Sequence, residues 1–238
     1  MKILGIDTTA TTASVGIWED GSPVAAYAQN GTLTHSETML HMVENCLRNA
    51  ALTVDDVDIL AVSAGPGSFT GVRIGVSLVK GLAFGKNKPC VAVSALEALA
   101  YNLAPLGAFG TPFYICPVMD ARRNQLYHAL FLCEGECITR LCDDRLIDAK
   151  TLEGELSSLA HPIYFVGEGC RVTERVIDLP HAHEIAPSMR YQSGYSVAAV
   201  AAKIYEEAED KAVFTDLALQ PTYLRASQAE RERNGEKE

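Results

Sequence analysis

The sequence predicts an α/β protein built from two halves that repeat one order of elements. Strand-like apolar runs alternate with helix-like runs along most of the chain. A cluster of proline and glycine at residues 105–112 divides these runs near the middle of the chain and has the composition of a linker. Each half follows a β-β-β-α-β-α order, so we expect a duplicated fold, with one lobe over residues 1–104 and the other over residues 105–225.

The first half begins with a three-stranded meander. Asp20-Gly21 suits the tight turn of a hairpin between its second and third strands. Thr34 and Glu37 match a capping box, in which both side chains satisfy free N–H groups at the start of a helix. We expect strands over residues 2–7, 14–19, 23–29, 58–64 and 90–94, and helices over residues 35–50, 71–85 and 95–103.

The second half repeats this order with weaker patterns. We expect strands over residues 113–119, 125–133, 137–147 and 163–166, helices over residues 151–159 and 193–209, and a further ordered segment near residues 171–179. The last helix can pack back on the first lobe. Residues 226–238 mix charges of both signs and carry no large apolar side chain, so we expect a disordered tail.

Composition limits where the chain works and what it binds. The chain has 238 residues, enough for two self-sustaining lobes, and its seven cysteines form an odd, scattered set typical of the reducing cytoplasm. Arg73 and Lys80 interrupt the longest apolar run, so we expect a cytoplasmic protein without a membrane helix. A net charge of −10 repels nucleic acid, so a partner protein would have to supply most of the contacts to any RNA.

The segment GPGSFTGVRIG at residues 65–75 is the strongest local motif, and it has two interpretations. It joins a strand to a helix, so its free N–H groups and the helix dipole can hold an anion. Alternatively, Gly71 and Gly75 share one helix face and let another helix approach closely. The packing interpretation is favoured because the segment has neither the P-loop ending nor the dinucleotide-binding spacing.

The helices over residues 35–50 and 71–85 carry more apolar surface than one sheet contact needs. Either the chain covers this surface itself, or a second subunit does; we favour the subunit. The residues that we expect to bind a partner are His35, Met39, Leu40, Val43, Leu47, Val72, Arg73, Val76, Val79 and Lys80.

Polar residues at several strand ends outline a nucleotide cleft. The Asp-Thr pair after the first strand resembles the phosphate-handling hairpin of the actin, sugar kinase and Hsp70 superfamily. The residues that we assign to a vestigial cleft are Asp7, Thr8, Asp120, Gly167 and Gly169. The bulk and charge of Glu168, and Arg122 beside Asp120, argue against a tight nucleotide site.

No catalytic or metal-binding set emerges from the sequence. His35 and His41 are six residues apart, which places them on different helix faces rather than in an i, i+4 chelating pair. His181 and His183 have no nearby cysteine or carboxylate that completes a metal site. From the residues alone we therefore assign no catalytic triad and no metal ion.

Several motifs spread along the chain belong together in one known family. They are IDT at residues 6–8, HSE at 35–37, the whole segment 65–75, SALEALA at 94–100, DAR at 120–122 and PTYLR at 221–225. The chain resembles the bacterial TsaB (YeaZ) family of tRNA threonylcarbamoyladenosine biosynthesis over nearly its full length. The long glycine-rich segment is the most specific part of this resemblance.

The resemblance implies a two-lobed actin-like/Hsp70-like (ASKHA) fold that has lost catalysis. It implies pairing through the first-lobe helices with a catalytic paralogue, TsaD, which transfers a threonylcarbamoyl group to the adenosine next to the anticodon of ANN-decoding tRNAs. The ATPase TsaE would be the third member. ATP and a metal ion would lie on the partner subunits, tRNA would be reached through the complex, and the isolated chain would form a homodimer.

Two other functions remain open. Asp7, Asp120, Gly167 and Gly169 are compatible with an ATP-dependent transferase or kinase of the same superfamily. A metallopeptidase is a third possibility, and it would require bound zinc.

Overall fold

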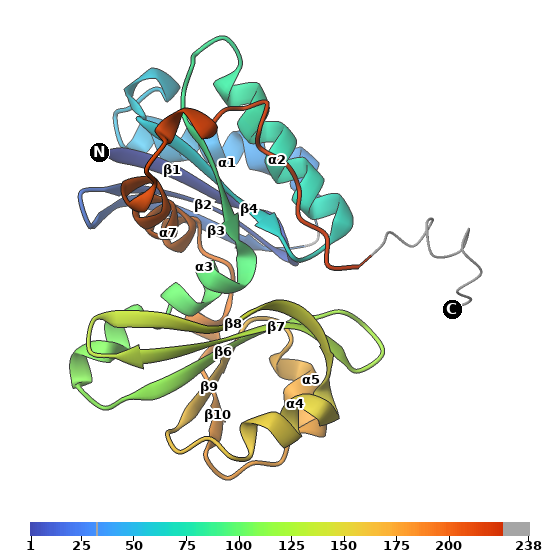
Figure 1. Cartoon of the computed structure of the whole chain (residues 1–238). Coiled ribbons are helices and arrows are strands. Elements are labelled where there is room, and N and C mark those ends of the chain that lie inside the picture. Colours follow the sequence, from blue (N-terminus) through green and yellow to red (C-terminus); the bar gives the residue numbers. More distant parts are fainter. Residues whose placement is uncertain (32, 226–238) are drawn as a thin grey trace.

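Two five-stranded sheets, one in each lobe, form the framework of the chain (Figure 1). The computed structural model describes residues 1–31 and 33–225. The tail predicted at residues 226–238 lies outside the described residues.

The first sheet has the strand order β3-β2-β1-β4-β5. Its strands are β1 (Lys2–Asp7), β2 (Thr12–Glu19), β3 (Ser22–Asn30), β4 (Ile59–Gly65) and β5 (Cys90–Ser94). The first three strands are antiparallel, and β4 and β5 run parallel to β1. Asp20 and Gly21 both have positive φ, as a two-residue turn between β2 and β3 requires, so the predicted hairpin is confirmed.

Helices cover both faces of this sheet. On one face lie α1 (His35–Asn49) and α2 (Phe69–Ala83), which pack on alternate strand residues such as Leu4 and Val62. On the other face lie α3 (Ala95–Tyr101) and α7 (Gly194–Glu207), which pack on the residues between these, such as Ile3 and Ala61. The predicted capping box at Thr34 starts α1. A short 3-10 helix, η1 (Val54–Asp56), follows α1.

The second sheet repeats the first, with the order β10-β9-β6-β7-β8. Its strands are β6 (Phe113–Asp120), β7 (Gln125–Glu134), β8 (Cys137–Asp148), β9 (Ile163–Val166) and β10 (Ala182–Glu184). The helices α4 (Ala149–Leu156) and α5 (Cys170–Val176) cover one face. The other face packs against α3, whose Leu96 and Leu99 lie in a core shared with Phe131, so α3 lies between the lobes.

The second lobe has one strand more than was predicted, whereas the fifth strand of the first lobe was predicted at residues 90–94. In each lobe a fifth strand, β5 or β10, pairs in parallel with the fourth. The sequence prediction missed β10 and the short α6 (Pro187–Arg190), because three- and four-residue elements are too short to show a periodic pattern.

The predicted linker at residues 105–112 is not a free connection. Residues Ala104–Phe109 form a 3-10 helix, η2, that packs on the second lobe. A Cβ on Gly107 would lie 1.8 Å from the carbonyl oxygen of Gly135, so this contact excludes any side chain. The prolines and glycines of this segment form a turn that packs on the second lobe. Composition alone cannot distinguish such a turn from a flexible linker.

The chain after residue 193 returns to the first lobe. The start of α7 contacts two strand glycines: a Cβ on Gly5 would lie 2.2 Å from the carbonyl oxygen of Gly194, and one on Gly16 would lie 2.4 Å from the nitrogen of Tyr195. Farther along, Leu219 is buried in the core beneath α1 and α2. By its contacts, the segment from α7 to residue 225 therefore belongs with the first lobe, although the sequence boundary placed it in the second.

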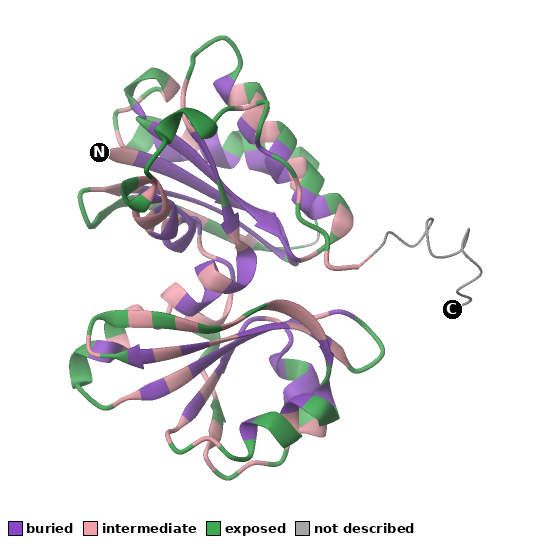
Figure 2. Cartoon of the chain, in the orientation of Figure 1, coloured by how far each residue is buried: buried purple, intermediate pink, exposed green. Residues whose placement is uncertain are grey.

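Burial is concentrated in the two sheets and on the helix faces that meet them (Figure 2). In the part of the chain that the structure describes, no helix combines the length and apolarity that a membrane crossing needs.

Candidate functional site

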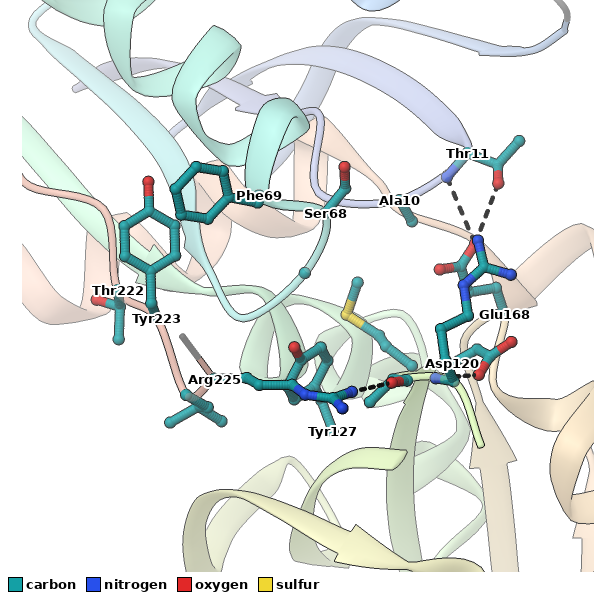
Figure 3. A pocket seen from close by; sticks show the side chains of 15 residues that line it. Ala10, Thr11, Ser68, Phe69, Asp120, Tyr127, Glu168, Thr222, Tyr223 and Arg225 are labelled. Atoms are coloured by element: carbon teal, nitrogen blue, oxygen red, sulfur yellow. Dashed lines mark hydrogen bonds between the residues drawn. The ribbon is translucent and has the colours of Figure 1, made fainter. Parts of the chain in front are cut away.

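A cleft of about 440 Å³ lies between the lobes (Figure 3). The first lobe supplies the turn after β1 and the start of α2, and the second supplies the ends of β6 and β9. The segment at residues 222–225 forms one wall. The side chains that Figure 3 labels around the cleft are Ala10, Thr11, Ser68, Phe69, Asp120, Tyr127, Glu168, Thr222, Tyr223 and Arg225.

Two contacts tie the lobes together at this cleft. The backbone N–H and the hydroxyl of Thr11 donate to Oε2 of Glu168 at 3.4 and 3.2 Å. Burial raises the pKa of the Glu168 carboxyl. On the other side, Nη1 of Arg225 donates to the carbonyl oxygen of Ala121 at 2.8 Å. Glu168 thus lies where the two lobes meet.

Asp7 is a structural carboxylate rather than a cleft residue. It is fully buried and accepts hydrogen bonds from Ser63 Oγ at 2.5 Å, the Thr9 nitrogen at 2.8 Å and Thr9 Oγ1 at 2.7 Å. Burial raises the pKa of the Asp7 carboxyl, and these hydrogen bonds partly offset that rise. The strand end that was predicted to handle phosphate is occupied by the chain's own hydroxyl groups.

Of the other four residues predicted for the vestigial cleft, three also lie outside it. Thr8 is buried and its hydroxyl donates to the carbonyl of Gly71 at 2.7 Å. Gly167 and Gly169 lie against the backbone of Val118. Asp120 lines the cleft, where Oδ1 accepts from the Arg122 nitrogen at 2.7 Å. Of the five predicted residues, the structure therefore brings only Asp120 into the cleft.

The glycine-rich segment is a packing device, although its neighbour is not the helix that we expected. Helix α2 begins at Phe69, and the Ser68 hydroxyl accepts from the Gly71 nitrogen at 3.3 Å. A Cβ on Gly71 would lie 2.0 Å from the Thr8 carbonyl oxygen, and one on Gly75 would lie 2.5 Å from the Thr8 hydroxyl. Both glycines therefore accommodate the turn that follows β1.

Most of the apolar surface predicted to bind a partner is covered by the chain itself. Six of the ten predicted residues are buried in the first-lobe core: Met39, Val43, Leu47, Val72, Val76 and Val79. The prediction that these six contact a partner is wrong, because α1 and α2 place them against the sheet and against each other. A helix pattern shows how much surface is apolar, but it cannot show that two neighbouring helices share it.

The remaining four predicted residues keep accessible surface. Leu40 is 47% exposed, and Arg73 is exposed on α2. His35 is half-buried at the start of α1, where its Nε2 lies 2.7 Å from the carbonyl oxygen of Ala10. Lys80 is half-buried near the end of α2.

A groove of about 600 Å³ runs between α1 and α2 on the outer surface. Leu40 forms one side, and Ile74 and Leu78 form the other. The guanidinium of Arg73 lies 3.9 Å from the centroid of the Phe69 ring at one end. The predicted partner residues did not include Ile74, Leu78 or Phe69. These three could have been found in the sequence, because they belong to the same helix as Arg73.

The segment at residues 219–225, which we call the C-terminal strap, joins this groove to the interlobe cleft. The Thr222 nitrogen donates to the Ala64 carbonyl at 2.7 Å. The Tyr223 ring stacks on Phe69 with centroids 4.6 Å apart, and its hydroxyl accepts from Arg73 Nε at 2.9 Å. The sequence motif marked these residues as ordered but gave them no role.

Metal ligands do not gather in the described part of the chain. Among those residues, no three His, Cys, Asp or Glu side chains lie where they can hold one metal ion. His41, at the surface of α1, lies 3.3 Å from Glu44. The structure therefore offers no described site at which a metal ligand set can be named.

Comparison with known proteins identifies the family. The family model for TsaD, tRNA N6-adenosine threonylcarbamoyltransferase, matches residues 30–232. The tRNA threonylcarbamoyladenosine biosynthesis protein TsaB of Bacillus subtilis is 31% identical over 180 residues, which cover 75% of this chain and 76% of the relative. The chain belongs to the TsaB family. TsaB of Escherichia coli is 37% identical over 131 residues, covering 54% of each chain.

Structural comparison supports the same assignment. The solved structure of YeaZ from Pseudomonas aeruginosa matches with a TM-score of 0.73 and 25% identity, covering 94% of this TsaB-family chain and 99% of YeaZ. Together with the repeated sheet order, this confirms the predicted two-lobed actin-like/Hsp70-like (ASKHA) fold. A tRNA N6-adenosine threonylcarbamoyltransferase of Brachyspira hyodysenteriae is 33% identical, but this TsaB-family chain covers only 52% of its length.

Proposed function

We propose that this chain is a non-catalytic subunit of the complex that makes threonylcarbamoyladenosine in tRNA. It binds and activates a catalytic TsaD paralogue, together with the ATPase TsaE, for transfer of the threonylcarbamoyl group to the adenosine next to the anticodon of ANN-decoding tRNAs. The observation that carries this proposal is the match to TsaB of Bacillus subtilis over three quarters of both chains.

The similarity to TsaD favours a paralogue rather than the transferase itself. The TsaD model matches most of the chain, yet the chain covers only about half of a TsaD relative. Two homologous chains of this kind can pair through equivalent surfaces. We therefore expect the ATP and the metal ion of the reaction to lie on the partner subunits.

The groove between α1 and α2 is the proposed docking surface for TsaD. Its sides are apolar and accessible at Leu40, Ile74 and Leu78, while Arg73 supplies a charge at its end. An apolar centre with a charged rim is typical of specific protein interfaces. We expect the same groove to support a homodimer when the chain is alone, and tRNA to be reached through the complex, because the chain's net charge is −10.

The geometry of the site gives little support to an ATP-dependent kinase or transferase. In ATP-dependent enzymes of this superfamily the first-strand carboxylate would have to face the nucleotide, whereas Asp7 here is buried and engaged by Ser63 and Thr9. Calorimetry with ATP and magnesium on the isolated chain distinguishes the two functions. Tight binding that Asp7→Asn abolishes would favour the enzyme.

Association with TsaD tests the proposal directly. The purified chain is mixed with a TsaD subunit from the same source and analysed by size-exclusion chromatography with light scattering. We expect a heteromer whose mass exceeds that of either subunit alone, and stimulation of threonylcarbamoyl transfer by TsaD in the presence of TsaE and ATP. Two separate peaks at micromolar concentrations, with no change in transfer, would contradict it.

A further inference from the structure

Arg73 places a single permanent charge in the α1–α2 groove. Among the described residues that line the groove there is no Asp, Glu or Lys, and apart from His35 the other side chains are apolar or carry a hydroxyl group. His35 already has a hydrogen-bond partner, because its Nε2 lies 2.7 Å from the Ala10 carbonyl oxygen. Any protein that docks in the groove must therefore accommodate the guanidinium of Arg73.

The Arg73 side chain is held in position by the chain itself. Its guanidinium lies over the Phe69 ring, 3.9 Å from the centroid, and its Nε donates to the Tyr223 hydroxyl at 2.9 Å. The Tyr223 ring stacks on Phe69, as Figure 3 shows. Because these contacts already fix the guanidinium, little conformational entropy is lost when a partner binds it.

Arg73 is exposed, and most of its hydrogen-bonding capacity is unused. An arginine has five N–H donors, and within the described chain the Nε donor is the one for which an acceptor is present. The two Nη atoms carry the other four donors, and a carboxylate fits such a fork through two parallel hydrogen bonds. Docking removes water from the guanidinium, and burying a charge without a counter-charge is costly. A tightly bound occupant of the groove therefore needs an Asp or Glu carboxylate at this position.

A second copy of this chain does not offer such a carboxylate from its described groove helices. In a symmetric pair the same groove faces itself, so each Arg73 meets a lining without Asp or Glu. The acidic residues of α1 and α2 are Glu37 and Glu44. Glu37 accepts from the backbone nitrogen and the hydroxyl of Thr34 at 3.0 and 2.7 Å, and Glu44 lies 3.3 Å from His41. Both carboxylates are thus already engaged.

We infer that Arg73 selects the occupant of the groove, by pairing with a carboxylate of the docked TsaD and by disfavouring a second copy of this chain. The inference rests on the proposed function, because it takes TsaD as the occupant. Specific interfaces commonly combine an attraction to the correct partner with a repulsive element against a competing one. Here one side chain supplies both, since its charge is paired in the heteromer and unpaired in the homodimer.

Replacing Arg73 by methionine tests the inference, because the two complexes should respond in opposite directions. Arg73→Met keeps an unbranched apolar stem but removes the charge at an exposed position, so the fold should be unaffected. The dissociation constant for TsaD, measured by biolayer interferometry on the full chain, should rise roughly tenfold or more. The homodimer, measured by sedimentation equilibrium, should become at least about threefold tighter. A dimer that appears in the variant when the unchanged chain is monomeric counts as the same result.

Two further variants separate charge from bulk. Arg73→Glu reverses the charge, so it should weaken TsaD binding more than Arg73→Met does and should not tighten the homodimer. Arg175→Met is the matched control. Arg175 is an exposed arginine on α5 of the second lobe whose Nε likewise donates to one oxygen, the Arg171 carbonyl, at 2.9 Å. Both dissociation constants should match those of the unchanged chain.

Salt dependence identifies the partner group as a charged one. Raising the salt concentration should weaken TsaD binding by the unchanged chain more than by Arg73→Met, because a charge pair is screened and a hydrogen bond to a neutral carbonyl is not. Equal salt dependence of the two chains would overturn the assignment of a carboxylate.

The selection itself would be overturned by TsaD binding that Arg73→Met leaves unchanged, or by an Arg73→Met homodimer no tighter than that of the unchanged chain. Failure of the unchanged chain to bind TsaD would instead contradict the proposed function. The two can therefore fail separately.

Discussion

The backbone of Thr8 occupies the space that a side chain on Gly71 would need. A Cβ at position 71 would lie 2.0 Å from the Thr8 carbonyl oxygen, and the Thr8 hydroxyl donates to the Gly71 carbonyl at 2.7 Å. The first turn of α2 is therefore fixed on the turn after β1 by the absence of a side chain. This contact places Phe69, which lines both the interlobe cleft and the α1–α2 groove, at the junction between them.

Gly71→Ala should destabilise the fold. Because the opposing atom belongs to the backbone and cannot rotate away, we expect a loss of about 1–3 kcal/mol in the free energy of unfolding. Gly81→Ala on the same helix is the control, since a Cβ there meets no atom within 4 Å. It should raise the stability by about 0.5–1 kcal/mol. Urea denaturation of both variants checks this, and equal effects would refute the packing role of Gly71.

Arg140 on β8 links the second lobe to α3. Nη2 of Arg140 donates to Oε2 of Glu97 on α3 at 2.7 Å, and Nη1 donates to Oδ1 of Asp144 at 2.6 Å. Ser94 Oγ donates to the other oxygen of Asp144 at 2.5 Å. Arg140→Met leaves two partly buried carboxylates without their cation, so we expect a loss of roughly 1–3 kcal/mol in the free energy of unfolding.

The matched control for this link is Arg145→Met, because Arg145 pairs with Glu155 inside the second lobe. It should cost less, at most about 1 kcal/mol, since this pair is more exposed than the Arg140 pairs. Circular dichroism during thermal unfolding measures both variants. If Arg140→Met unfolds like the unchanged chain, the interlobe ion pairs contribute nothing to stability.

His128 should make the fold sensitive to acid. It is 1% exposed on β7, and burial, with a smaller contribution from Arg145, lowers its pKa from 6.5 to about 3. The unfolded chain binds a proton at this histidine below about pH 6.5 while the folded chain does not. Stability from this group is therefore complete above pH 6.5 and falls as the pH drops toward 3, by about 2 kcal/mol between pH 6.5 and 5.

NMR titration measures this directly. The imidazole resonances of His128 should stay those of the neutral ring down to about pH 4, and His128→Gln should remove the corresponding slope from the pH dependence of stability. A His128 ring that titrates near pH 6.5 in the folded chain would contradict the burial argument.

The fold was largely readable from the sequence because its long elements carry strong local signals. The turn at Asp20-Gly21, the capping box at Thr34 and Glu37, and the alternating strands set the order of the first lobe. The elements that escaped prediction, β10 and α6, are held by neighbouring strands and loops rather than by their own patterns. Their existence depends on tertiary contacts that no short window contains.

The candidate site could be predicted only in part, because it depends on contacts between residues that are far apart in the sequence. Asp7 was assigned to a nucleotide cleft and Val76 to a partner surface, because the sequence does not show that the Ser63 hydroxyl donates to Asp7 or that the first-lobe core covers Val76. Both depend on contacts between residues far apart in the chain. Tyr223 and Phe69, which shape the boundary between cleft and groove, are separated by more than half of the chain and meet only in the fold.

The most direct test of the account is the affinity of a matched pair of variants for TsaD. Leu40→Asp places a carboxylate in the α1–α2 groove, whereas Leu141→Asp makes the same change on β8 at a leucine of equal exposure, 46% against 47%. We expect Leu40→Asp to weaken binding by roughly tenfold or more, because docking would bury an unpaired charge, and Leu141→Asp to leave the dissociation constant unchanged. Equal affinities of the two folded variants would contradict the assignment of this groove as the docking surface.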